Sequence, residues 1–194
     1  MNTLIRIHHA TAKALERSDW LLPTLARVLF AAILLVYFWK SALTKLGDGM
    51  LGLFSPSMGA YAQIFPRAME AADYDISQLG LFHWAVVTAG TWGEFLLPVL
   101  VVLGLFARLA ALGMIGFVVV MTLTDLYGHD VISEPASLGA WFDGAPGSII
   151  LDQRALWVFL LVTLVIKGAG PLSLDRVLLN RAPARDSAAV PLSN

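Results

Sequence analysis

The sequence predicts an all-α membrane protein: a polytopic four-helix bundle with both termini in the cytoplasm and two apolar loops on the outer side. Hydrophobic residues make up 58% of the 194 positions and charged residues only 14%, whereas soluble domains average roughly 45–50% and 25%. Four segments are apolar enough to cross a bilayer, and lysine and arginine gather on one side of them. This composition excludes a disordered chain, a nucleic-acid binder and a small disulfide scaffold.

Each predicted span approaches the roughly 20 apolar residues that a helix needs to cross the hydrocarbon core. The spans cover residues 21–43, 79–105, 109–127 and 155–166. The second contains Glu94 and Pro98, and the fourth has only 12 residues between Arg154 and Lys167. The fourth still counts as a span because those two cations can extend outward to the interface and flanking apolar residues lengthen it.

The orientation follows from lysine and arginine, which are in excess in cytoplasmic loops. Nine of the 13 lie on the side of the two termini: Arg6, Lys13, Arg17, Arg27, Arg108, Lys167, Arg176, Arg181 and Arg185. The opposite side carries four: Lys40, Lys45, Arg67 and Arg154. Both termini are therefore predicted to lie in the cytoplasm.

The two ends of the chain are predicted to lie outside the membrane domain, which covers residues 21–180. Residues 1–20 are broken up by charges and lack a small-residue cleavage site. They are predicted to form an uncleaved, weakly amphipathic helix at the membrane surface. Residues 181–194 are polar and contain proline, which predicts a disordered cytoplasmic tail.

Two long segments on the predicted outer side, 46–78 and 128–153, are rich in large apolar side chains. Segments of this composition are expected to lie on the mouth of the bundle. Aromatic residues also gather at this end, and two interpretations stay open: an interfacial aromatic belt, or a lidded apolar pocket that opens outward. The belt is the simpler interpretation of any single aromatic residue, but not of both segments together.

Glu94 is the clearest ionisable residue inside a predicted span, where such groups are costly and usually face the bundle interior. Pro98 deprives the Glu94 carbonyl of its helical partner and should bend the helix. Gly90 and Gly93 remove side-chain bulk beside it, so that a helix or a ligand can approach closely. Glu94 is thus either a functional carboxylate or half of an ion pair that locks the helices together.

Glu94 has three candidate partners on the first span: Arg27, Lys40 and Lys45. Counting inward from the outer ends at about 1.5 Å per residue places Glu94 roughly 12 Å deeper than Lys40. Asp125 lies nearer the depth of the two lysines. We therefore expect Asp125 to pair with Lys40 or Lys45, and the partner of Glu94 stays open.

Histidines and acidic residues cluster at the outer end of the predicted bundle. Asp125 and His129 are four residues apart and share a face if the helix continues through Gly128. Together with His83 and Asp130 they could bind a divalent metal, although no HxxxH or HxH pair fixes the geometry. The alternative is a role in proton handling or in binding a quinone headgroup, which needs a histidine or carboxylate at the membrane boundary.

The chain contains no cysteine, which excludes disulfides, thiolate nucleophiles and Cys-ligated metal or iron–sulfur sites. It also lacks the GxSxG, Walker, GxGxxG and HExxH patterns of other enzyme classes. Any redox chemistry therefore requires a bound cofactor or a partner chain.

Several segments resemble the DoxX family of bacterial membrane proteins. They are WKSALTKLG at the end of the first span, GEFLLPVLVVLGLFARLAALGM across the second and third, and IKGAGPLSLDRVL at the exit of the fourth. The resemblance covers about residues 20–180. It implies that the family's characteristic polar positions fall on Arg27, Lys45, Glu94 and Arg108.

The resemblance also implies a membrane subunit rather than a self-sufficient enzyme. Founding members of the family are associated with a thiosulfate:quinone oxidoreductase, and others with membrane complexes that handle thiol or oxidative stress. The long outer segments, with TDLYGHD and FDGAPG, look like a branch encoded beside machinery for ribosomally made copper-binding peptides.

Two functions from different classes follow. The first is a redox-linked subunit of the bacterial inner membrane that binds a quinone, with Glu94, Asp125 and His129 handling protons and Lys45 orienting the headgroup. The second is a non-enzymatic anchor or accessory protein for a partner, in which the buried charges are structural. Either is expected to involve the lipid bilayer and a protein partner or a homo-oligomer. A transporter is a third alternative, disfavoured because four spans show no evident inverted repeat.

Overall fold

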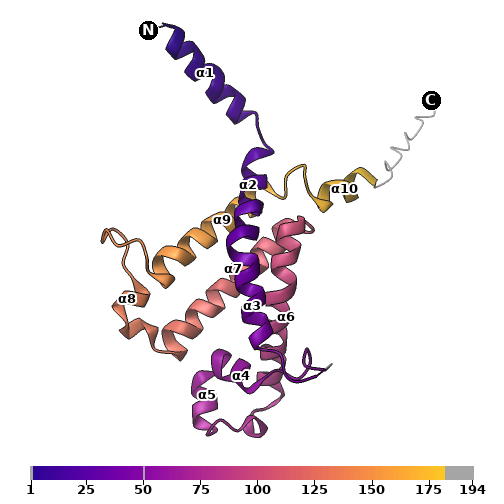
Figure 1. Cartoon of the computed structure of the whole chain (residues 1–194), viewed down its shortest axis with the longest axis vertical. Helices are drawn as coiled ribbons and strands as arrows, with labels where there is room; N and C mark the ends of the chain where they lie inside the picture. Colours follow the sequence, from indigo (N-terminus) through magenta and orange to yellow (C-terminus); the bar gives the residue numbers. More distant parts are fainter. Residues whose placement is uncertain (1, 50, 182–194) are drawn as a thin grey trace, which may run out of the picture.

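The structure, a computed structural model, describes residues 2–49 and 51–181, and every regular element within them is a helix (Figure 1). Four helices are long and apolar enough to cross a membrane: Leu21–Thr44, Leu81–Leu103, Ala107–Gly128 and Ile149–Lys167. The predicted all-α, four-span architecture is confirmed. The side of the membrane on which the termini lie stays a prediction, and the predicted disordered tail falls, from residue 182 on, outside the described residues.

Three of the spans contain a π-helical turn. The first span is α2 (Leu21–Phe30), a π turn at Ala31–Leu35 and α3 (Val36–Thr44). The second is α6 (Leu81–Leu103), the third is α7 (Ala107–Leu123) with a π turn at Thr124–Gly128, and the fourth is a π turn at Ile149–Gln153 followed by α9 (Arg154–Lys167). The remaining helices are α1 (Asn2–Glu16), α4 (Met58–Ile64), α5 (Pro66–Ala71), α8 (Pro135–Leu138) and α10 (Leu174–Arg181), with short 3₁₀ turns at Ile76–Gln78 and Val131–Ser133.

The core lies where the four spans cross. Phe30, Phe38, Val101, Met114 and Leu161, which come from all four spans, are fully buried there. The α7–α9 pair is inclined to α3 and α6 (Figure 1). The outward faces of the spans carry exposed apolar side chains, which is the arrangement expected of a lipid-facing surface.

Helix α6 continues through Pro98 rather than ending there. The Trp39 indole donates a hydrogen bond to the Phe95 carbonyl, at 3.2 Å, in the turn that precedes the proline. The proline therefore lies inside one continuous 23-residue helix.

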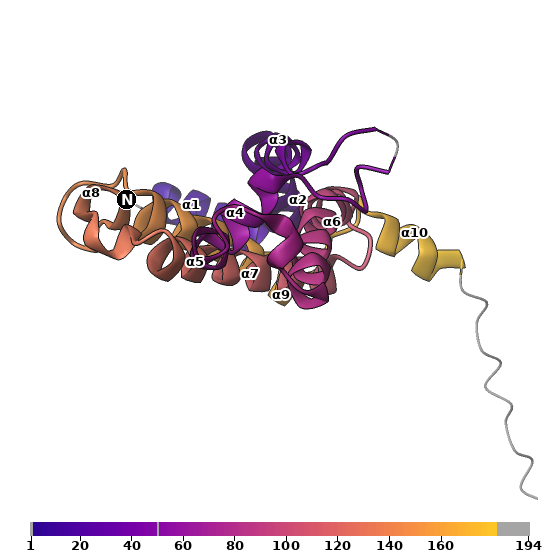
Figure 2. The ribbon, with the colours of Figure 1, turned by 90° about the horizontal axis from the view of Figure 1, so that it is seen from below.

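The segment 46–78 folds against the N-terminal part of α6, as expected. Ala60, Tyr61 and Met69 are buried in a second core with Val87 of α6, and α4 and α5 lie at the end of the bundle where α3 ends and α6 begins (Figures 1 and 2). Burial raises the pKa of Tyr61 above its ordinary value. This segment is thus a small helical cap rather than a loop.

The second long segment, 128–153, covers less of the bundle. The Trp141 indole donates to the Leu151 carbonyl at 2.9 Å, and the Asp152 carboxylate accepts from the backbone N–H and the hydroxyl of Ser148. Trp141 nevertheless stays 64% exposed and Phe142 is fully exposed with a positive φ of 68°. The expectation that both segments lie on the bundle mouth therefore holds better for the first than for the second.

Candidate functional site

A cavity of about 390 Å³ lies between α6 and α7, and this volume is within the range of small-molecule sites. Ile64 and Gln63 of α4 form part of its lining at one end. Four glycines contribute to the walls: Gly90 and Gly93 on α6, and Gly113 and Gly116 on α7. A Cβ atom added at Gly116 would meet nothing within 4 Å. The polar side chains of the lining are Lys45, Gln63, Glu94, Thr124 and Asp125.

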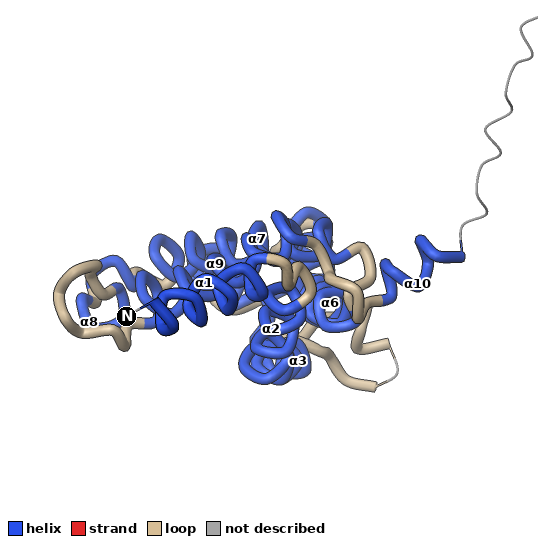
Figure 3. Tube along the Cα trace, turned by 90° about the horizontal axis from the view of Figure 1, so that it is seen from above, coloured by secondary structure: helices blue, strands red, loops and turns tan. Residues whose placement is uncertain are grey.

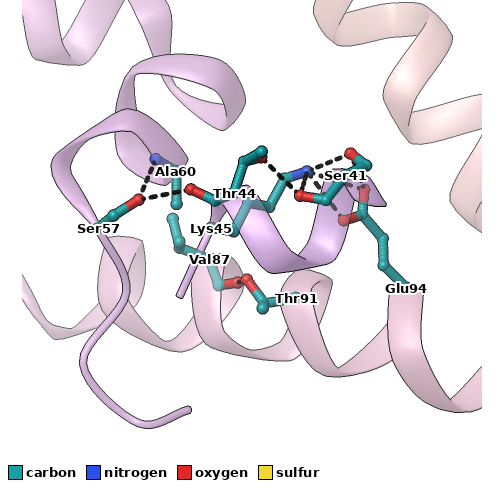
Figure 4. A network of polar contacts seen from close by, with 8 residues as sticks. All are labelled: Ser41, Thr44, Lys45, Ser57, Ala60, Val87, Thr91 and Glu94. Carbon is teal, nitrogen blue, oxygen red and sulfur yellow. Dashed lines mark hydrogen bonds and ion pairs between the residues drawn. The ribbon is translucent and has the colours of Figure 1, made fainter. Parts of the chain in front are cut away.

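Lys45 and Glu94 form a buried ion pair at the wall of this cavity (Figure 4). The Lys45 Nζ atom lies 2.8 Å from Glu94 Oε2 and 3.0 Å from Oε1. The Ser41 hydroxyl accepts from Lys45 Nζ at 2.7 Å and donates to Glu94 Oε1 at 3.3 Å. Because the two charged side chains are only 3% and 4% exposed, each depends on the other for compensation of its charge.

The expectation about pairing is therefore wrong for Lys45. The expectation assumed that the outer ends of the first and second spans lie at the same depth in the membrane. In the structure α3 ends at Thr44, and Lys45 is its C-cap, whereas α6 extends 13 residues outward from Glu94 to Leu81, about 20 Å. The offset is filled by the segment 46–78, whose Ser57 N–H donates to the Lys45 carbonyl at 2.9 Å.

Asp125 pairs with Arg154 of the fourth span, and with neither Lys40 nor Lys45. Arg154 Nη2 donates to Asp125 Oδ2, and Nη1 donates to the Thr122 hydroxyl at 3.0 Å. Arg154 is 5% exposed, so it does not extend to the interface as the sequence suggested. Lys40 is exposed and makes no ion pair within residues 2–49 and 51–181.

The histidines lie outside the cavity lining. The third span does continue through Gly128, as a π turn with His129 as its C-cap, but Asp125 and His129 have different partners, since Asp125 pairs with Arg154. His129 Nε2 lies 2.9 Å from the Gln63 carbonyl and ties this end of the third span to α4. The His83 ring packs edge-on against the Phe65 ring, with centroids 4.8 Å apart.

The structure does not bring the candidate metal ligands together. Asp130 accepts from the Ser133 hydroxyl at 2.9 Å. Across the described part of the chain, no three His, Cys, Asp or Glu side chains are grouped closely enough to hold a metal ion.

Arg27 and Arg108 lie at the opposite end of the bundle. The Arg27 guanidinium donates to the carbonyls of Val101 and Val102 at the end of α6, and to those of Ala169 and Leu172 beyond α9. A cation there compensates the partial negative charge of the carbonyls at helix C-terminal ends. Arg27 therefore has a structural role in joining α2, α6 and the exit of α9, through carbonyls rather than an ion pair.

The cavity therefore has two carboxylates at its wall, each compensated by one cation. Within the described residues, Asp125 Oδ1 and the side chains of Gln63 and Thr124 have no hydrogen-bond partner. Carboxylates at membrane depth that face a cavity can hold or pass protons. Sequence reasoning missed Arg154 and Gln63, because neither carried a signal beyond its polarity.

Comparison with known proteins matches the chain to a protein family. The model of the family described as DoxX matches residues 22–125, more than half of the chain. The matched part runs from the start of α2 to Asp125, so it contains Lys45 and Glu94 but not Arg154. No curated protein and no solved structure matches the chain. With four apolar spans and this match, the chain belongs to the DoxX family.

Proposed function

We propose that this chain is the membrane subunit of a redox-linked system of the bacterial inner membrane and that the cavity between α6 and α7 binds a quinone headgroup. The observation that carries the proposal is an apolar cavity within the spans whose wall includes two ion-paired carboxylates, Glu94 and Asp125. A quinone has a flat apolar ring with two carbonyl oxygens. Glycine-lined walls admit such a ring, and polar groups at the edges orient it.

Different residues at the cavity contribute to binding the headgroup and to handling protons. The Lys45 ammonium is engaged by Glu94 and Ser41, so it acts on the headgroup through Glu94 rather than by direct contact. The Gln63 amide and the Thr124 hydroxyl are the donors free to bind a carbonyl oxygen. The His129 ring contacts the backbone carbonyl of Gln63. His129 therefore holds Gln63 in place and does not handle protons itself.

The electron balance requires a partner. Reduction of a quinone to a quinol takes two electrons and two protons. The cysteine-free chain carries no thiol to supply electrons, so a redox partner protein supplies them. Glu94 and Asp125 are positioned to hold protons at the cavity wall.

Filling the cavity tests the binding site. Gly116→Leu is expected to weaken binding of decylubiquinone at least roughly tenfold, equivalent to about 1.4 kcal/mol, because the new side chain enters the open space beside Gly116. Binding is measured by titrating the purified protein in detergent, and by extracting quinone that co-purifies from native membranes.

Gly147→Leu is the matched control, because Gly147 also has open space around it but lies outside the cavity. The control is expected to bind decylubiquinone like the unmodified protein. Equal binding by all three proteins would contradict the proposed site.

An accessory role is the second candidate, and the exposed side chain of Phe142 favours it. In that role the outer segment docks a partner and both ion pairs are structural. Phe142→Ser is then expected to abolish cross-linking of a partner in native membranes, whereas Ile132→Ser, a 49% exposed control in the same segment, retains it. Unchanged cross-linking in Phe142→Ser would argue against docking at this segment.

A further inference from the structure

At the end of the bundle where α2 begins, the structure contains a second cleft, of about 890 Å³. It is formed by the α1–α2 junction, the start of α7, the exit of α9 and α10. In the view from above, α1 and α10 extend from the bundle in opposite directions (Figure 3). Four cations line it, one from each of these segments: Arg17, Arg108, Lys167 and Arg176. Nothing in the proposed quinone site uses them.

The cleft carries an excess of positive charge. Its two carboxylates are Asp19 and Asp175. Asp175 caps the start of α7, accepting from the backbone N–H groups of Phe106 at 2.7 Å and Ala107 at 3.0 Å. Asp19 lies 3.8 Å from the Lys167 ammonium, both being solvent-exposed. In the described part of the chain the other three cations make no ion pair.

Exposed apolar side chains border the same cleft. Trp20, Phe106, Leu109 and Leu178 all line it and are 49–68% exposed. All four spans begin or end at this level, at Leu21, Leu103, Ala107 and Lys167, so the membrane boundary passes through the cleft. The cleft thus combines cations with an apolar border at the depth where lipid headgroups meet acyl chains.

We propose that this cleft binds one anionic phospholipid, with its phosphodiester held by Arg108 and Lys167 and its acyl chains against the apolar border. The charge of the cleft complements an anionic headgroup, and cations near an anionic membrane surface attract such lipids. A zwitterionic headgroup would bring its own cation against the four cations of the lining. A free phosphate would leave the apolar border uncovered.

The test compares lipids bound to the full chain in detergent by native mass spectrometry. The unmodified protein is expected to retain dioleoylphosphatidylglycerol in preference to dioleoylphosphatidylcholine. Arg108→Gln/Lys167→Gln is expected to bind the anionic lipid about 25-fold more weakly, because each cation contributes about a fivefold factor. Arg6→Gln/Lys13→Gln removes the same charge from α1, outside the cleft, and is expected to bind normally.

Three results would overturn the proposal. The first is equal weakening by the α1 control, which would indicate general surface charge. The second is equal retention of phosphatidylcholine. The third is displacement of the lipid by millimolar inorganic phosphate, which would indicate a free-anion site. The charge-preserving variant Arg108→Lys controls for a folding defect and is expected to retain the lipid. Quinone binding by each variant is measured in parallel and is expected to be unaffected.

Discussion

Replacement of Lys45 by methionine is expected to lower the free energy of unfolding by about 3–5 kcal/mol. Methionine has a similar length but no charge, so the substitution leaves the buried Glu94 carboxylate without its cation. It also removes the hydrogen bonds that the ammonium makes to both carboxylate oxygens and to Ser41. Denaturation of the purified protein in mild detergent, followed by circular dichroism, measures the loss.

Lys40→Met is the matched control, because Lys40 lies on the same helix but is exposed. It is expected to change stability by less than about 0.5 kcal/mol. Equal losses from the two variants would show that the Lys45–Glu94 pair does not hold the helices together.

The double variant Lys45→Met/Glu94→Leu separates a structural role of the pair from a functional one. Replacing both charges with apolar groups of similar volume is often neutral or stabilising, so most of the lost stability is expected to return. If the stable double variant no longer binds decylubiquinone, the Glu94 carboxylate contributes to binding. If it binds normally, the pair is structural only.

The spans could be predicted because their signal is local. Length and hydropathy place the first span at 21–43, and the structure has Leu21–Thr44. No tertiary information is needed for that step, since the bilayer sets the required length. The DoxX resemblance likewise rests on contiguous segments, and the family match covers residues 22–125.

The ion pairs could not be predicted because they depend on offsets between helices. The difference in outward extent between α3 and α6 arises from the folding of residues 46–78 on α6, which hydropathy does not reveal. The π turn at Thr124–Gly128 also makes side-chain directions at the end of the third span hard to predict from the sequence, because its i→i+5 hydrogen bonds differ from those of an α-helix. The direction of Asp125 toward Arg154 therefore does not follow from a 3.6-residue period.

Gly104→Ala is expected to destabilise the protein by about 2–5 kcal/mol. Gly104 ends α6 with φ +65°, and the N–H groups of Gly104 and Leu105 donate to the carbonyls of Val101 and Leu100, a glycine-dependent helix end. A side chain in this conformation costs about 1–2 kcal/mol. An added Cβ would also lie 2.7 Å from Ser173 Cβ and 2.9 Å from Arg27 Cζ, which adds about 1–3 kcal/mol of overpacking.

The contact with Arg27 makes the strain at Gly104 difficult to relieve. The guanidinium is held by four carbonyls, among them those of Val102 and Ala169, so it cannot move without breaking the junction of α2, α6 and the exit of α9. Gly144→Ala is the control, since Gly144 has a similar φ of +78° but no atom within 4 Å of an added Cβ. The control is expected to lose only the conformational part, about 1–2 kcal/mol. Equal losses in the two variants, measured by the same unfolding assay, would show that the packing around Gly104 contributes nothing and that the backbone conformation alone requires glycine there.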